Sequence, residues 1–484
     1  MTSLTNMQRK IVFALAILLL FVAMYPYKAY LHREATKRDL GEATIGDVDT
    51  GSFMLKLALL GGARGIAANV LWTRTIELQK AQDWDKMKAT VNLITKLQPH
   101  FLQIWTYQGW NLAYNVSVEW DAPEDKYEWI KQGIKFLQDG VSKNLKSPDL
   151  LWDTAWTYYH KLGFADETII LRRLFRDDTD ESFKRDPIDG HVYNDNFQLA
   201  HGWFGRAIRL ADAGESRLIE GVEREVDLVD APVQRKGRPG DLAFRAMPAH
   251  AQTRYAIGLE KESMIGIPAQ FGEVAKNEWG KALNDWVTFG TFTFFNPNDI
   301  QIDGKSVKQP IHIDDATNAV KLATLHENQR HWADRWASQM NYPYWKDRCA
   351  AEMEPEGVAA RQLFYEGTKA YKAAEFPVAV DKYREGLTIW NELLKRHKNY
   401  RDDELNKKDT GLIVKRYARA CQQLGVEVPK NTPFLDLLPY VENDTTVDPF
   451  DAMEMTTRSA APAAPAGATP SRPQPGGGGA PGPK

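Results

Sequence analysis

The chain has 484 residues, of which 43% are hydrophobic, enough for a sizeable core or for about two to three domains. Its formal net charge is only −3, so the strong basic field of a typical nucleic-acid-binding protein is excluded. Two cysteines, Cys349 and Cys421, are too few for a disulfide framework. They leave two possibilities open, a single bridge in an oxidising compartment or two buried thiols.

An uncharged apolar segment near the N-terminus predicts a membrane anchor. Met1–Lys10 is polar, and Ile11–Tyr27 then runs for 17 residues without a charge, near the lower limit of about 17 residues for a spanning helix. A cleaved signal peptide is the alternative, but no small-residue cleavage site follows the apolar core. We therefore expect a single-pass protein of the cell membrane. Its short N-terminal tail indicates a body outside the cytoplasm, although basic residues on both sides leave the orientation open.

The next segments lead from this anchor to the helical body. Residues 28–52 are polar and mixed in charge, which predicts a stalk. Residues 53–70 are apolar again, but Lys56, Arg64 and a pair of glycines interrupt them. A charge near the centre of a membrane span costs about 3 kcal/mol. We therefore prefer a buried or interfacial helix here, with a second membrane span as the alternative.

Tryptophans at the starts of successive predicted helices indicate a repeat. Trp72 and Trp105 lie 33 residues apart, and Trp152 opens a third helix. A period of this length is typical of helix-turn-helix repeats. Pro99 ends the first unit six residues before Trp105, which is the punctuation that such a repeat requires.

The second helix of each unit carries a further signature. Side chains spaced by four and then three residues recur at Met87–Val91–Ile94, Gly133–Leu137–Gly140, Ala275–Trp279–Ala282 and Ala379–Tyr383–Gly386. One such triplet occurs on any amphipathic helix, but four of them, two with matching Gly or Pro punctuation, indicate a real repeat. We predict an all-α fold, a tetratricopeptide-like α-solenoid with an N-terminal transmembrane helix and a disordered C-terminal tail. The last unit, with Gly367 and Phe376, is nearest to the tetratricopeptide consensus.

The middle of the chain is less regular, and the end changes in composition. We expect a helix over 196–213, loops over 172–185 and 226–241, a hairpin within 295–313 and helices over 314–340. Arg458–Lys484 is rich in Ala, Pro and Gly and carries no acid, so a disordered tail is predicted. The predicted organisation is therefore a tail 1–10, an anchor 11–27, a stalk 28–52, repeats 53–163, a middle region 164–345, C-terminal repeats 346–441 and a tail 442–484.

Several short motifs carry a family resemblance. They are Leu60–Gly65, Leu97–Pro99, Trp110–Asn115, Tyr158–Gly163, Pro248–His250, Tyr344–Cys349 and Tyr365–Gly367. Over roughly Leu55 to Leu438 the chain resembles a family of uncharacterised, membrane-anchored, tetratricopeptide-like proteins of planctomycetes and related bacteria. Some members are named after an iron-responsive element, but this chain has no basic stripe with interleaved aromatics and no RNA-binding module. The resemblance implies no established activity, and we expect no nucleic-acid partner.

The sequence offers no catalytic or metal-binding motif. There is no HExxH, no cysteine pair at zinc spacing, no phosphate loop and no GxSxG elbow. We therefore predict no catalytic residue, no metal ligand, no cofactor and no enzymatic activity. The alternative is an enzyme or metal-binding protein whose site lies in residues 164–341 and uses His191, His201, His250 or His326.

The predicted binding residues lie in the first two repeats. Asn111 and Asn115 are four residues apart on one helix, so they share a face and could hydrogen-bond the backbone of a partner. Arg64 and Arg74 are candidates for holding an acidic end of a peptide. The function that we expect is a membrane-anchored scaffold that binds other proteins at the cell envelope. A purely structural envelope protein, whose tail reaches a neighbouring layer, is a weaker third hypothesis.

Overall fold

A computed structural model describes the helical body of the chain. The described residues are 30, 64–165, 167–187, 189–212, 241–261, 268–295, 300–302 and 305–442. The predicted anchor at 11–27 and the tail after 442 lie outside them, as do most of the stalk and the loop at 226–240. Among the described residues, no helix is long and apolar enough to cross a membrane.

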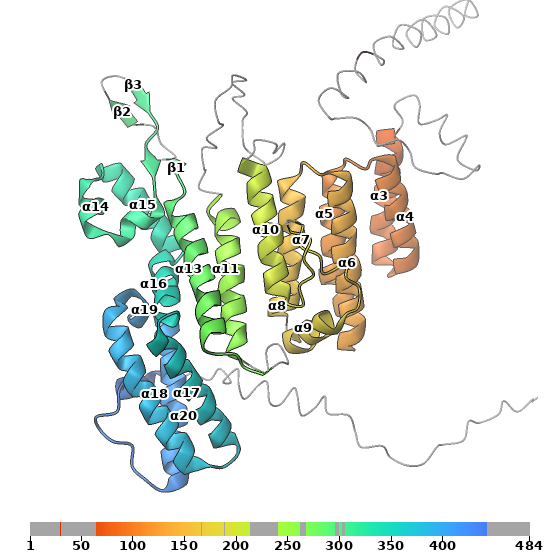
Figure 1. Cartoon of the computed structure of the whole chain (residues 1–484). Coiled ribbons are helices and arrows are strands. Elements are labelled where there is room, and N and C mark those ends of the chain that lie inside the picture. The colour runs from red at the N-terminus through yellow and green to blue at the C-terminus, as the bar shows by residue number, and fades with distance from the viewer. Residues whose placement is uncertain are drawn as a thin grey trace, which may run out of the picture. The chain divides into compact units, whose positions relative to one another are not determined.

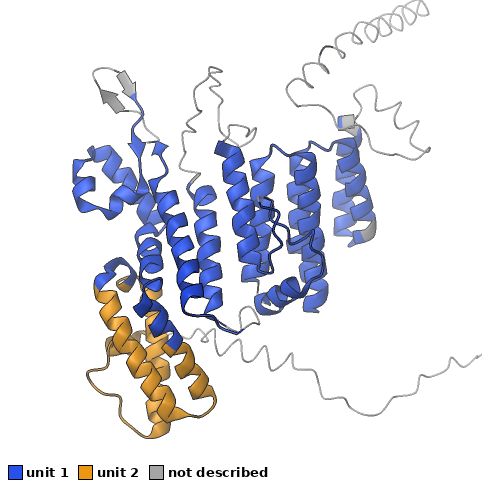
Figure 2. Ribbon diagram, viewed as in Figure 1, with its two compact units in different colours: residues 1–362, 396–400 blue, residues 363–395, 401–484 orange. Residues whose placement is uncertain are grey.

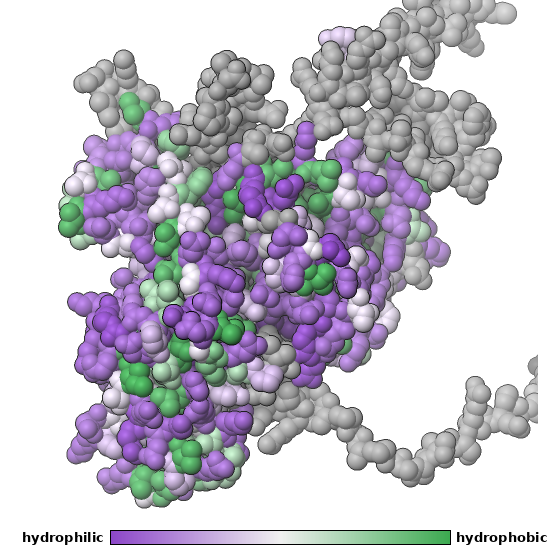
Figure 3. All heavy atoms as spheres, in the orientation of Figure 1, coloured by the Kyte–Doolittle hydropathy of each residue, from purple (hydrophilic) through white to green (hydrophobic). Residues whose placement is uncertain are grey.

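The described chain is mostly helical, so the predicted all-α class is confirmed. It divides into two compact units, which Figure 2 shows in different colours. Unit 1 comprises residues 1–362 and 396–400, and unit 2 comprises residues 363–395 and 401–484. On the face drawn in Figure 3, hydrophilic side chains predominate on both units, and apolar side chains form small groups among them.

Most of the longer helices of unit 1 run side by side in a row (Figure 1). The first half of the unit contains α3 (Arg64–Lys80), α4 (Trp84–Leu97), α5 (Leu102–Trp110), α6 (Pro123–Lys143), α7 (Pro148–Trp156), α8 (Leu162–Phe164) and α9 (Thr168–Asp177), of which α9 lies across the lower ends of its neighbours in Figure 1. The second half contains α10 (Asn196–Asp212), α11 (Asp241–Leu259), α13 (Glu273–Thr291), α14 (Ala319–Thr324), α15 (Glu327–Gln339) and α16 (Tyr342–Glu352), of which α14 and α15 lie to one side of the row. Contacts join α3 to α4, α5 to α6, α7 to α10, and then α10, α11, α13 and α16 in sequence.

Short connections force neighbouring helices to run antiparallel. Only three residues separate α3 from α4, and Asp83 caps α4 by accepting a hydrogen bond from the backbone N–H of Lys86 at 3.3 Å. Ser147 caps α7 in the same way, with Leu150 as the donor, and Pro148 follows at the first helical position. The predicted helix starts at Trp72 and Trp105 fall inside α3 and α5 instead, because each helix begins several residues earlier.

Small residues let α5 and α6 cross at very short distance. A Cβ atom at Gly133 would lie 2.7 Å from the backbone oxygen of Gly109 and 2.9 Å from Ala113. A Cβ atom at Gly140 would lie 2.8 Å from the ring of Trp105. The spaced residues of the predicted second helix therefore do face its partner. Met87, Val91 and Ile94 on α4, and Ala275, Trp279 and Ala282 on α13, are likewise almost fully buried.

The middle region is more regular than its sequence indicates. The predicted loop at 172–185 is wrong in its first half, which forms the end of α9. Leu171 and Phe175, four residues apart, share a face and bury themselves in the core with α7 and α10. The predicted hairpin is confirmed: β1 (Phe294–Phe295) pairs with β4 (Pro310–Ile311), and β2 (Ile300–Ile302) pairs with β3 (Lys305–Val307), both antiparallel. The predicted helix at 196–213 is confirmed as α10.

Unit 2 is built on a helical hairpin of its own. Its elements are α17 (Pro355–Lys372, from residue 363 onward), α18 (Phe376–Arg396, to residue 395), the last residue of α19 (Lys398–Arg401), α20 (Glu404–Leu424) and α21 (Leu438–Glu442). Tyr383 packs over Gly367, and the ring of Phe364 packs over Gly386. Trp390 is fully buried and donates a hydrogen bond to Thr410 of α20 at 3.2 Å.

The two cysteines are free thiols, and both are buried. Of the two possibilities that the sequence left open, the structure therefore contains two buried thiols. Burial raises the pKa of the Cys349 thiol to about 12, which keeps it protonated and unreactive at neutral pH.

Candidate functional site

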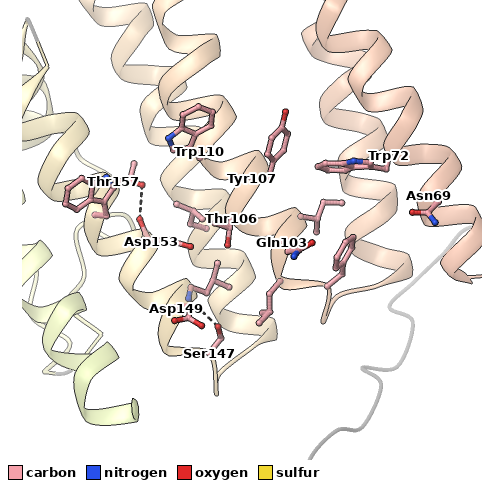
Figure 4. Close-up of a pocket in the computed structure, with 16 residues that line it drawn as sticks. Asn69, Trp72, Gln103, Thr106, Tyr107, Trp110, Ser147, Asp149, Asp153 and Thr157 are labelled. Carbon is pink, nitrogen blue, oxygen red and sulfur yellow. Dashed lines mark hydrogen bonds between the residues drawn. The ribbon is translucent and has the colours of Figure 1, made fainter. Parts of the chain in front are cut away.

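A groove lies across the first helices of three successive helical pairs, α3, α5 and α7 (Figure 4). Its volume is about 840 Å³. Sixteen residues line it, and we call it the α3–α5–α7 groove: Asn69, Trp72, Phe101, Leu102, Gln103, Ile104, Thr106, Tyr107, Trp110, Leu137, Ser147, Asp149, Leu150, Asp153, Trp156 and Thr157.

Helical periodicity explains why these side chains reach the groove. On α5, Gln103, Tyr107 and Trp110 follow at spacings of four and three residues, so they share one face. Trp105 on the same helix turns the other way and is buried in the core. The same spacing brings Asp149, Asp153 and Trp156 of α7 to the groove. Each helix therefore contributes one stripe of side chains to a common surface.

Aromatic rings dominate this surface and are already held in place. The ring of Trp72 meets the edge of Tyr107 at 5.1 Å between centroids, which bridges α3 and α5. Trp110 stacks on Tyr114 at 5.7 Å, and Trp156 stacks on Trp152 at 5.3 Å. Tyr107 and Trp110 nevertheless expose 38% and 45% of their surface. Exposed apolar rings with fixed positions are typical of binding surfaces.

A row of stacked rings continues from the groove along the same helices. Tyr114 stacks on His160 at 5.9 Å, and His160 stacks on Trp156 at 5.0 Å. The hydroxyl of Tyr114 also lies 3.3 Å from Nδ1 of His160. Burial lowers the pKa of His160, and the Lys161 ammonium acts in the same direction, so the ring is neutral at pH 7. These contacts tie the ends of α5 and α7 together beside the groove.

The charge in the groove is negative. Asp149 and Asp153 line it, and none of its sixteen residues is Lys, Arg or His. Burial raises the pKa of the Asp153 carboxyl to about 6, although a hydrogen bond with Thr106 acts in the opposite direction. Asp153 is therefore largely ionised at pH 7, and a positive group placed beside it would favour its charged form.

Two π-helical segments follow the groove tryptophans. Residues 111–116 (η2) come directly after Trp110, and residues 157–161 (η4) come directly after Trp156. The two segments contact each other, so the wider π-helical turns that follow α5 and α7 lie side by side. Such turns are frequent at functional sites because they change the direction of the side chains that flank them.

The structure places the two predicted asparagines away from the open groove. Asn111 is completely buried, and its Oδ1 accepts hydrogen bonds from Gln79 and from Asn115, both at 2.9 Å. Its side chain joins α3 to η2, which leaves no surface for the backbone of a partner. Asn115 is half-buried beside it. A direct binding role for this pair stays a prediction, and the position of Asn111 favours a structural role.

The two predicted arginines are both on α3. Arg74 is exposed and pairs with Glu77 one turn away at 2.9 Å, and it does not line the groove. Arg64 is the first residue of α3, and its side chain lies outside the described part of the structure. Of the predicted binding residues whose side chains the structure describes, Asn111, Asn115 and Arg74, none lines the groove.

The groove residues themselves were not identified as a binding site from the sequence. The spacing of Trp72 predicts only a helix start. No motif predicts a binding role for Tyr107, Trp110, Asp153 or Trp156. Their i, i+3 and i+4 spacing on two predicted helices was a usable signal. Because aromatic stripes at that spacing usually form the core, the sequence alone favours burial over exposure.

The histidines of the alternative hypothesis lie in separate settings. The ring of His191 meets the edge of Tyr193 at 4.6 Å, on the turn-rich segment before α10. Nε2 of His201 lies 2.9 Å from the carboxylate of Asp285, which joins α10 to α13. The two histidines therefore contact different partners.

The other two histidines have packing and capping roles. His250 is half-buried and packs edge-on against Trp286 and Trp345, at 4.8 and 5.5 Å between centroids. Burial lowers its pKa to about 4, so it is neutral at pH 7. His326 caps α15 by accepting from the backbone N–H of Asn328 at 3.3 Å. Across the described ranges, no group of three His, Cys, Asp or Glu side chains could hold a metal ion.

A buried charged cluster is a further feature that sequence reasoning missed. The Nε–H of Arg361 is shared between the two carboxylate oxygens of Glu352, at 3.0 and 3.1 Å, and the hydroxyl of Tyr400 donates to Glu352 at 2.6 Å. Glu260 lies 4.0 Å from Arg361 and accepts from Trp279 at 3.0 Å. These groups are largely buried. The cluster therefore has a structural role, because it connects the segments of unit 1 that carry these residues.

Comparison with known proteins does not assign the chain to a family. No model of a known protein family matches it, and no curated protein matches it. The function must therefore be argued from the geometry of the groove.

Proposed function

We propose that this protein is a membrane-anchored scaffold that binds an extended segment of another protein in the α3–α5–α7 groove. The observation that carries the proposal is the groove itself, where the exposed rings of Tyr107 and Trp110 on α5 share one surface with the half-buried rings of Trp72 on α3 and Trp156 on α7. No cofactor or catalytic step is part of the proposal. Binding would rely on a preformed shape, rigid rings and a few polar groups that fix the orientation of the ligand.

The geometry favours a peptide over a flat protein surface. Most of the lining residues come from α3, α5 and α7, with Leu137 added from α6, so the groove runs across several helices. Its rings are held by mutual contacts, for example Trp72 on Tyr107 at 5.1 Å. Such preorganisation lowers the entropy lost when a partner binds, and tryptophan and tyrosine are the side chains that most often dominate binding energy.

The tetratricopeptide-like identity of the repeat is part of the proposal. It is supported by the close crossing of α5 and α6 at Gly109 and Gly133. Unit 2 contains the same kind of contact at Gly367 and Gly386. A groove lined by the first helix of each pair is the surface that such repeats use for binding.

The location at the envelope is likewise proposed. It is supported by the uncharged segment 11–27 and by the resemblance to membrane-anchored planctomycete proteins. The helical body would then lie outside the cytoplasm, where its groove could meet proteins of the envelope.

The experiment that tests this function compares two exposed tryptophans. Trp110 lines the groove and is 45% exposed, whereas Trp120 lies outside it and is 39% exposed. Each stacks on one aromatic neighbour, at 5.7 Å and 6.3 Å. Full-length wild type, Trp110→Ala and Trp120→Ala would be cross-linked mildly in native membranes, recovered, and analysed by mass spectrometry.

We expect Trp110→Ala to lose a discrete set of partners at least about tenfold, because truncating a central aromatic anchor usually costs that much affinity. Trp120→Ala should retain the set. The same partners at the same yield with both variants would contradict the proposal, and so would the absence of any reproducible partner.

A further inference from the structure

The chemistry of the groove narrows the class of peptide that it can hold, provided that the proposed binding function is correct. We propose that the α3–α5–α7 groove binds a proline-rich peptide that carries arginine, and that residues 458–484 of a second copy of this chain are its ligand. The inference rests on the charge of the groove, on its aromatic rings and on the composition of that segment.

Charge complementarity is the first step. Asp149 and Asp153 line the groove, and no cationic side chain does. Residues 458–484 contain Arg458, Arg472 and Lys484 and no acidic residue. An arginine that enters the groove would be attracted by these carboxylates and would meet no like charge among the lining residues.

The aromatic surface is the second step. Proline-rich segments bind to grooves lined by Trp and Tyr, because their left-handed extended helix exists before binding and loses little entropy. Trp72, Tyr107, Trp110 and Trp156 supply such rings from three helices. Trp and Tyr rings can also take a guanidinium group on their faces. The groove thus offers both kinds of contact that a Pro- and Arg-containing peptide needs.

The spacing within residues 458–484 is the third step. The segment holds seven prolines, and two Pro-x-x-Pro sequences occur in it, at 462–465 and 470–473. In an extended proline-type helix with three residues per turn, Pro470 and Pro473 lie on one side. In such a helix Arg472 would point to another side, where it would reach a carboxylate while the prolines contact rings.

The test uses the full-length protein in mild detergent and a fluorescent synthetic peptide with the sequence of residues 458–484. Fluorescence anisotropy would measure its Kd with wild type, Trp110→Ala, Asp153→Asn and the control Trp120→Ala. A second peptide would carry Pro470→Ala, Arg472→Ala and Pro473→Ala. Circular dichroism would establish that each variant is folded.

We expect saturable binding to wild type and to Trp120→Ala, and Kd values at least about tenfold higher for Trp110→Ala and for the substituted peptide. The Asp153→Asn substitution should raise the Kd of the original peptide by a larger factor than it raises the Kd of a peptide that carries Arg472→Ala alone. Sedimentation equilibrium should show self-association of wild type that Trp110→Ala reduces and Trp120→Ala does not.

Three results would overturn the inference. They are no peptide binding, equal binding to Trp110→Ala and Trp120→Ala, and peptide binding without self-association of the full chain. The last result would mean that the ligand belongs to another protein. All three leave the proposed function separately testable, because partner capture that depends on Trp110 can still succeed when this peptide fails.

Discussion

Asn111 joins two helices through a single side-chain amide. It has no exposed surface, and its Oδ1 accepts hydrogen bonds from Gln79 on α3 and from Asn115 one turn away, both at 2.9 Å. Removing the amide would leave the Gln79 donor without this partner in a partly buried position. The loss of such a buried hydrogen bond costs about 1–3 kcal/mol.

We therefore predict that Asn111→Ala lowers the free energy of unfolding by about 1–3 kcal/mol. Asn115→Ala, which removes only one donor from a half-buried position, should cost less. Chemical denaturation followed by tryptophan fluorescence would measure both. If Asn111→Ala were as stable as wild type yet lost its partners, the direct binding role that the sequence predicts for Asn111 would be favoured.

Glu260 makes the stability of the buried cluster depend on pH. Burial raises the pKa of its carboxyl to about 7, and the carboxylate of Glu352 acts in the same direction, while Arg361 opposes both. A folded-state pKa above the ordinary value of 4.5 means that the folded protein binds the proton more tightly than the unfolded chain. This contribution to stability is complete below pH 4.5 and is lost as the pH rises through about 7.

Replacing Glu260 by Gln removes the ionisable group and keeps an acceptor for Trp279. We predict that Glu260→Gln is more stable than wild type at pH 8 by about 2 kcal/mol and close to wild type at pH 5. Thermal unfolding across this range would show the difference. A variant that is less stable than wild type at pH 8 would mean that attraction to Arg361 outweighs the desolvation of the Glu260 carboxylate.

At the scale of the elements, α5 and α6 depend on a close crossing. A Cβ atom at Gly133 would meet the backbone oxygen of Gly109 at 2.7 Å and Ala113 at 2.9 Å, and neither is the end of a flexible side chain. Gly280 on α13 also lies inside a helix, but a Cβ atom there would meet nothing closer than 3.8 Å. The two glycines therefore form a matched pair for testing the crossing.

We predict that Gly133→Ala destabilises the protein by about 1–3 kcal/mol, because α5 and α6 must move apart. Gly280→Ala should stabilise it by about 0.5–1 kcal/mol through the higher helix propensity of alanine. Denaturant titrations of both variants would check the opposite signs. Stabilisation by both substitutions would contradict the close packing of α5 on α6.

The sequence predicted where the helices lie better than it predicted which of their side chains are exposed. Tryptophan spacing and Gly–Pro punctuation were sufficient to locate the paired helices, because the core of each pair repeats with helical periodicity. They could not show that Tyr107 and Trp110 are exposed, since an exposed aromatic stripe and a buried one have the same spacing. The wide turns after Trp110 and Trp156 also have no clear sequence signal. The charged residues around Leu171 and Phe175 favour the prediction of a loop. The segment is nevertheless helical, because a helix buries both of these apolar side chains in the core.

At the scale of the whole molecule, we propose that the α3–α5–α7 groove binds a segment of another protein chain. The all-α class and the repeat-like succession of helices could be read from the chain, because they arise from local periodicity. The groove could not, because it forms only when α3, α5 and α7 lie side by side and their outward stripes meet. Asp153 shows this dependence, since its raised pKa results from burial by neighbouring helices.

Site-specific photo-cross-linking would test the central claim most directly. A benzophenone side chain would replace Tyr107, which is 38% exposed within the groove, or Val118, which is 60% exposed outside it. After irradiation in native membranes, mass spectrometry would identify the attached peptide. The account predicts one discrete peptide adduct at position 107 and no such adduct at position 118. Equal adducts at both positions, or adducts at 118 alone, would contradict it.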